Sequence, residues 1–163
     1  LLENAKAVQS GLQGSLVREV LQMHGTEIVE QQRIQLLEGK NSHGEDIHPF
    51  YTEDIKPRGW FKSRESAARY AAWKETLNYP YSVTRNSNAP NLYINGRFYS
   101  EMEVRFEADT LGIYPTSGFA SEIMAKYGLH RFGLSALKWQ VMMNEKGVKN
   151  EIQQRMKDLL YGN

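Results

Sequence analysis

The sequence predicts an α+β fold with long amphipathic helices at both ends, a helix in the middle and a small antiparallel β-hairpin. Three observations support this prediction. Apolar residues recur every three or four positions near both ends of the chain, as on one face of a helix. Residues 63–77 are rich in alanine and other good helix formers. Residues 102–106 alternate between apolar and charged side chains, which is typical of a strand with one solvated face.

The N-terminal helix is predicted over residues 12–38, where the apolar side chains follow a helical spacing. Gly25 weakens the middle of this helix and predicts a kink, and Gly39 stands where a C-terminal cap belongs. Residues 39–62 contain several glycines and prolines and have no periodicity, so we expect an ordered loop. The helix over 63–77 begins at serines that can cap it.

The remaining elements are expected in chain order, and together all 163 residues (1–163) are predicted to form a single domain. They are a polar linker at 78–90, a β-hairpin at 91–115, a helix at 117–128, and a final helix or helix pair at 135–160 that is interrupted near Gly147.

Composition excludes several classes of function. Twenty basic and nineteen acidic side chains leave a net charge of +1, so no global field attracts nucleic acid or an acidic membrane. The absence of cysteine excludes disulfides, thiolate chemistry and cysteine-based zinc sites, and fits a reducing cytosol. No apolar run approaches the roughly 18 residues of a membrane span, and the first residues lack a signal-peptide pattern. We therefore expect no membrane partner.

The stretch "EGKNSHGEDIHPFY" (38–51) gathers histidines and carboxylates within a few positions. Zinc ligands are usually held on a helix face or strand, as in H-E-x-x-H, and this spacing in a Gly- and Pro-containing loop does not match. The stretch is more typical of a polar turn with solvated carboxylates and two inward apolar residues. That interpretation places Asn41, Ser42 and Gly44 in the turn and Ile47 and Phe50 inside.

Other catalytic patterns are also missing from the sequence. It has no G-x-S-x-G elbow, no phosphate-binding Walker loop and no G-x-G-x-x-G fingerprint. We therefore predict no enzymatic activity, no catalytic residue, no metal ligand and no cofactor. An enzyme built on His43, Glu45 and His48 is the third and last hypothesis.

A local basic stretch, "KPRGWFKSRESAARYAAWK" (56–74), interleaves cations with aromatic side chains. Such a combination can bind phosphates and stack on bases, although the aromatics would equally form the buried face of a helix. The candidate contacts with DNA or a partner are Lys56, Arg58, Lys62, Arg64, Arg69 and Lys74. A small DNA-binding accessory protein is therefore the second hypothesis.

Three segments, in order, resemble the small virion proteins of tailed bacteriophages that form the head–tail connector, neck and tail-completion group. "IQLLEGKNSHGEDIHPFY" is similar to that group's helix, Gly, polar turn, Gly and Tyr anchor. "LYINGRFYSEMEV" resembles its leucine, two residues, Thr-Gly and aromatic before a hairpin, with Asn95 in place of the threonine. "YGLHRFGLS" resembles its Tyr-Gly and Phe-Gly-Leu before the last helix. The style of the first segment is similar to versions from phages of Bacteroidetes hosts, including the crAss-like group.

This resemblance implies a structural role in the virion and is the first hypothesis. It implies copies assembled as a ring at the neck or tail-completion position, between the portal and the tail, after synthesis in the host cytoplasm. It also implies portal and other neck or tail proteins as partners, with non-specific contact to packaged DNA. In the chain itself, we expect Tyr51, Trp60 and Phe98 to be packing anchors of the loop and hairpin.

Overall fold

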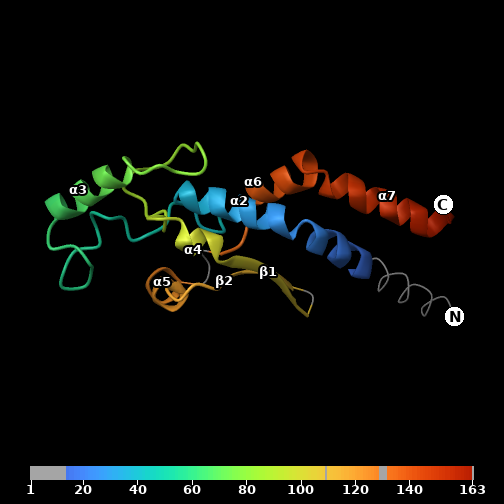
Figure 1. Cartoon of the computed structure of the whole chain (residues 1–163), viewed down its shortest axis with the longest axis horizontal. Coiled ribbons are helices and arrows are strands. Elements are labelled where there is room, and N and C mark those ends of the chain that lie inside the picture. Colours follow the sequence, from blue (N-terminus) through green and yellow to red (C-terminus); the bar gives the residue numbers. More distant parts are fainter. Residues whose placement is uncertain (1–13, 109, 129–131, 163) are drawn as a thin grey trace.

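The computed structural model describes residues 14–108, 110–128 and 132–162, which form the predicted α+β fold. Figure 1 shows an elongated molecule, with α3 (Arg64–Lys74) at one end and the C-terminal end of α7 (Val148–Tyr161) at the other. The expected helix start at residue 12 lies outside the described residues, as do residues 129–131 of "YGLHRFGLS". Within the described ranges, no helix is both long enough and apolar enough to cross a bilayer.

The N-terminal helix is interrupted where the sequence predicts a kink. Residues 14–23 are helical, His24 is a turn residue, and α2 (Gly25–Leu37) continues the helix. The α2 helix ends in a Schellman motif, because Gly39 has a left-handed φ of 73° and its N–H donates to the carbonyl of Leu36 at 2.9 Å. The Lys40 N–H donates to the carbonyl of Gln35 at 3.0 Å and completes the motif.

The middle helix, α3 (Arg64–Lys74), is shorter than the predicted 63–77. It begins with a reciprocal capping box in which the Ser66 N–H donates to Ser63 Oγ at 3.2 Å and the Ser63 N–H donates to Ser66 Oγ at 3.0 Å. The expected linker at 78–90 is held to its surroundings. Arg85, whose side chain is buried, contacts Glu75 Oε1 at 2.6 Å and the Ala89 carbonyl at 2.7 Å.

The hairpin pairs β1 (Met102–Glu107) with β2 (Thr110–Pro115) in antiparallel register, with Met102 opposite Pro115 and Glu107 opposite Thr110. The predicted hairpin at 91–115 is therefore too long at its N-terminal end. Residues preceding β1 instead form the short helix α4 (Arg97–Ser100) after Gly96, whose φ is 80°. Consecutive Phe98 and Tyr99 are both buried, which a strand with one buried face does not allow.

The C-terminal part contains α5 (Ala120–Tyr127), α6 (Ala136–Gln140), a π-helical turn η2 (Val141–Glu145) and α7. The interruption expected near Gly147 occurs at that residue, whose φ is 76°. In the core, α2 packs against β1 on one side and against α6 and η2 on another. Its buried residues include Ile28, Leu36 and Leu37, with Met142 from η2 and Ile113 from β2.

Candidate functional site

The histidine-containing stretch is a polar turn in the structure. The Asn41 side-chain carbonyl accepts hydrogen bonds from the backbone N–H groups of His43 (2.9 Å) and Glu45 (3.1 Å), which is an Asx-type turn. Gly44 has a φ of 80° within it, and Ile47 is fully buried just after it. The interpretation as a turn is therefore confirmed, and so is the inward position of Ile47, whereas Phe50 is only half-buried and its ring lies 4.0 Å from the ring of the exposed His48.

Two of the three side chains of the third hypothesis, those of Glu45 and His48, make local contacts. His43 and His48 are both exposed, and His48 Nδ1 lies 3.1 Å from Glu53 Oε2. Glu45 Oε2 accepts a 3.4 Å hydrogen bond from the Asn41 amide. Across the described parts of the chain, no group of three or more histidine or carboxylate side chains is arranged to hold a metal ion.

The basic segment 56–74 divides into two kinds of residue. Five of its six candidate contact residues are exposed, namely Lys56, Arg58, Lys62, Arg64 and Arg69. Lys74 is not, since only 1% of its surface is accessible and its ammonium group donates to the backbone carbonyl of Tyr93. The expectation that Lys74 contacts DNA or a partner is therefore wrong, because its position in α3 points inward beside two buried alanines of the same helix, Ala67 and Ala71.

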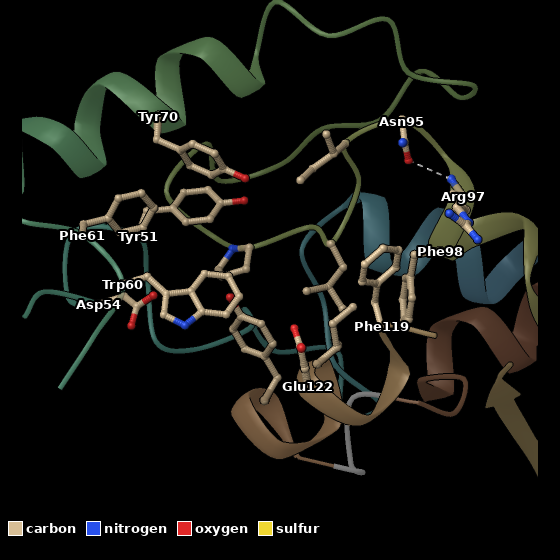
Figure 2. Close-up of a pocket in the computed structure, with 15 residues that line it drawn as sticks. Tyr51, Asp54, Trp60, Phe61, Tyr70, Asn95, Arg97, Phe98, Phe119 and Glu122 are labelled. Carbon is tan, nitrogen blue, oxygen red and sulfur yellow. Dashed lines mark hydrogen bonds between the residues drawn. The ribbon is translucent and has the colours of Figure 1, made fainter. Parts of the chain in front are cut away.

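A pocket of about 280 Å³ lies between the loop before α3, α3 itself, the segment before α4, and α5. Figure 2 shows its aromatic walls, with the Tyr51 and Tyr70 hydroxyl groups directed toward the interior. The aromatic lining includes Tyr51, Trp60, Phe61, Tyr70, Phe98 and Phe119. A concave, mostly aromatic site of this kind is suited to bind an apolar or aromatic group.

The rings on the α3 side of the pocket hold one another in place. The Tyr51 ring is edge-on to the Tyr70 ring at 5.1 Å between centroids and to the Phe61 ring at 6.1 Å. Tyr51 is buried, and burial raises the pKa of its hydroxyl. Because its hydroxyl stays neutral over the physiological range, Tyr51 gives the pocket a rigid aromatic wall and no charge.

Trp60 does not have the role predicted for it. Tyr51 and Phe98 are buried, but 62% of the Trp60 surface is exposed at the mouth of the pocket. Its ring lies against the ammonium of Lys126, 3.7 Å from the ring centroid. Lys126 also forms an ion pair with the buried carboxylate of Asp54. The prediction that Trp60 is a packing anchor was wrong, because the neighbouring Phe61, and not Trp60, packs on the cluster of Tyr51 and Ala67.

Replacing Trp60 with alanine is therefore expected to lower the free energy of unfolding by less than about 1 kcal/mol, because an exposed ring loses little burial. Tyr51→Ala, by contrast, is expected to cost about 3–5 kcal/mol, since it removes a buried ring from the same loop. Urea unfolding followed by circular dichroism measures both values. A cost for Trp60→Ala as large as that for Tyr51→Ala would contradict the exposed position of Trp60.

Two charged residues stand at the mouth of the pocket. The Arg97 guanidinium lies over the Phe119 ring at 5.7 Å and 3.5 Å from Glu101 Oε1. Glu122 is exposed on α5, and Figure 2 shows its carboxylate directed toward the pocket. No ion pair joins Glu122 to another residue in the described ranges. The pocket thus has an aromatic interior, an Arg97–Glu101 ion pair at its mouth, and at its rim the available negative charge of Glu122.

The sequence predicted some of the residues that line this pocket, but it did not predict the pocket itself. Tyr51, Trp60 and Phe98 were singled out as packing residues, and all three line it. Phe119 and Glu122 were missed, because they lie at the start of α5, which is distant from the other lining residues along the chain. The sequence around Phe119 and Glu122 shows no pattern that predicts a pocket, because only the tertiary fold brings α5 against the loop before α3.

A second apolar surface lies at the end of α7. Leu159, Leu160 and Tyr161 are exposed there, and Tyr161 has 77% of its surface accessible. Among the fourteen residues of α7, Val148 alone is buried, and Ile152 is a further apolar residue that packs on the core. The polar side chains of Glu151 and Arg155 contact the helical segment before α2 at His24 and Glu19. The helix beyond Ile152 therefore presents apolar side chains that the described part of the chain does not cover.

Comparison of the chain with protein-family models, with curated proteins and with solved structures finds no match. Its functional assignment therefore depends on the two apolar surfaces and on the sequence resemblance.

Proposed function

We propose that this protein is a structural virion component of a tailed phage that assembles with itself as a ring at the neck or tail-completion position. The observation that carries the proposal is an aromatic pocket walled by α3 and α5 together with exposed apolar side chains at the end of α7. Figure 1 places α3 and α5 toward one end of the elongated molecule and the end of α7 at the other. Contiguous exposed apolar surface on a folded chain marks an interaction site.

The exposed part of α7 also argues for assembly on energetic grounds. Isolated helices shorter than about 12–15 residues are marginal in water, and helices in proteins gain most of their stability from packing. The α7 helix has fourteen residues and buries only Val148. A partner surface along α7 would supply the packing that the described chain does not.

Local structure supports the resemblance to neck and tail-completion proteins at two of its three segments. "IQLLEGKNSHGEDIHPFY" forms a helix, a left-handed Gly39, a polar turn with a left-handed Gly44, and a buried Tyr51, in the order that the resemblance implies. "LYINGRFYSEMEV" leads through a left-handed Gly96 and buried Phe98 into β1. These features support a common structural plan, and with it partners such as the portal and other neck or tail proteins.

The purified chain is expected to form a closed oligomer whose mass is an integral multiple of 18.8 kDa. Sedimentation equilibrium gives the mass, and negative-stain electron microscopy shows whether the particles are rings with a central channel. Rings are expected because a contact between two different surfaces of identical subunits closes by rotation or extends as a filament. A chain that remains monomeric at about 100 μM would contradict the proposal, since contacts of even moderate affinity are populated at that concentration.

The five exposed cations of segment 56–74 favour contact with DNA as a second activity, either in the channel of such a ring or in a separate accessory protein. Binding of the purified chain to duplex DNA of random sequence is expected to weaken steeply with salt, because cations that neutralise phosphates release counterions. Fluorescence anisotropy across a salt series measures the slope. Replacing Arg64 and Arg69 with glutamine should reduce that slope by about 2 if both contact phosphates.

A further inference from the structure

The end of α7 presents one face that combines a charge with two apolar side chains. Lys157, Leu160 and Tyr161 are separated by three and four positions, so they lie together on one side of the helix. All three are exposed. Lys157 forms no ion pair with another residue in the described ranges. This face therefore exposes the apolar side chains of Leu160 and Tyr161 at the end of the helix, with the positive charge of Lys157 one turn before them.

The pocket at the other end of the molecule has the complementary properties. Trp60, Ile94 and Phe119 line it and are exposed at its mouth, with 51% of the Phe119 surface accessible. The Glu122 carboxylate on α5, one turn from Phe119, supplies an available negative charge at the rim. An aromatic group in such a pocket makes edge-to-face ring contacts, and a cation placed at the rim would pair with Glu122.

The two surfaces cannot meet within one chain. Figure 1 places α3 and α5, which wall the pocket, toward one end of the molecule and the end of α7 at the opposite end. Contact between them therefore requires two copies. Such a contact joins different surfaces of identical chains, and each copy keeps one free pocket and one free α7 end until the assembly closes.

We infer that the end of α7 of one copy docks into the aromatic pocket of the next, with Leu160 and Tyr161 against Trp60 and Phe119 and with Lys157 beside Glu122. This inference rests on the proposed function and specifies the contact that joins neighbouring copies. It also gives the exposed Trp60 a role, as a wall that becomes buried on assembly.

Disulfide cross-linking tests the contact directly, because the chain has no cysteine of its own. The double variant Glu122→Cys/Lys157→Cys keeps the four apolar side chains of the contact and is expected to form a ladder of covalent multimers under mild oxidation, visible on a non-reducing gel. Disulfides form only where the two Cα atoms approach within about 7 Å, so at least about tenfold more multimer is expected than from either single variant. The matched control Met23→Cys/Lys157→Cys moves the first cysteine to an exposed residue outside the pocket and should not form the ladder.

The outcomes separate this inference from the proposed function. Rings without a ladder would overturn the docking contact and leave the assembly role intact, whereas monomers without a ladder would overturn both. A ladder without rings or filaments would support the contact and contradict the ring.

Swapping the charges of Glu122 and Lys157 gives a second test of the contact, and this test does not depend on oxidation. Glu122→Lys and Lys157→Glu are each expected to weaken association about tenfold, because like charges then face each other at the rim. The double variant Glu122→Lys/Lys157→Glu should restore it. Both residues are exposed, so neither substitution disturbs the core, and circular dichroism of each variant checks that it is folded. Unchanged association in both single variants would overturn the pairing.

Discussion

Replacing Gln35 with methionine is expected to lower the free energy of unfolding by about 2–6 kcal/mol, although the two side chains have similar size and shape. Gln35 is fully buried in α2, and its amide donates to the Gly133 carbonyl at 2.8 Å while its side-chain oxygen accepts from the Ser135 N–H at 2.8 Å. Methionine fills the space and leaves both backbone groups without a partner, each at a cost of about 1–3 kcal/mol.

Urea unfolding of Gln35→Met gives this loss, and Gln22→Met provides a matched control on the preceding helical segment. Gln22 is exposed, so the same chemical change there is expected to alter stability by less than about 0.5 kcal/mol. Equal stability of Gln35→Met and the original chain would show that the Gly133–Ser135 segment is not held by this glutamine.

The glutamines of α2 show what periodicity cannot predict. A helical pattern assigns polar residues to the solvent side, yet Gln31, Gln32 and Gln35 are all buried. Two of them bind the backbone of residues 133–135, about a hundred positions away in the chain, with Gln32 accepting from the Gly133 N–H at 2.7 Å. Long-range hydrogen bonds of this kind leave no local signal, because their partner is a backbone group that every residue carries.

Elements fixed by local chemistry could be predicted from the sequence. The serine cap of α3, the left-handed glycine after α2 and the break at Gly147 each depend on a residue within one turn of the feature. The alternation over 102–106 likewise predicted β1, because one face of the hairpin is buried. The helix α4 before β1 was not predicted. Asn95 and Gly96 turn the chain into this helix, and the Arg97 N–H donates to Asn95 Oδ1 at 3.2 Å.

The pocket could be predicted only in part, because its lining also depends on contacts between distant segments of the chain. Aromatic residues near positions 51–61 and 70–73 indicate packing, but the tertiary fold decides which of the neighbouring rings enters the shared cluster. Phe61 and Tyr70 enclose Tyr51, and Trp60 is left at the rim beside Lys126. Sequence therefore predicts that such a loop is anchored, whereas the residue that anchors it and the residue that remains available to a partner are set by the tertiary fold.

The free energy of unfolding is expected to rise between pH 7 and about pH 9.5, because Lys74 is buried and has no carboxylate partner among the described residues. Burial, and after it the Arg85 guanidinium, lowers the pKa of Lys74 from 10.5 to about 7. Between these two values the unfolded chain binds one more proton than the folded chain, so stability is lost as pH falls toward 7. The slope contributed by this residue is at most about 1.4 kcal/mol per pH unit.

Urea unfolding at several pH values measures this slope, and Lys74→Met is expected to remove it. Methionine preserves the length of the side chain without a titrating group, and it leaves only the Tyr93 carbonyl without its donor. The exposed Lys62→Met is the matched control and should retain the slope, since its ammonium stays in water in both states. Measurement stops near pH 9.5 because burial raises the pKa of the Tyr51 and Tyr99 hydroxyls, which adds the opposite slope at higher pH. Equal slopes in Lys74→Met and the original chain would mean that the Lys74 ammonium is solvated, and α3 would then have to lie differently against the Tyr93 backbone.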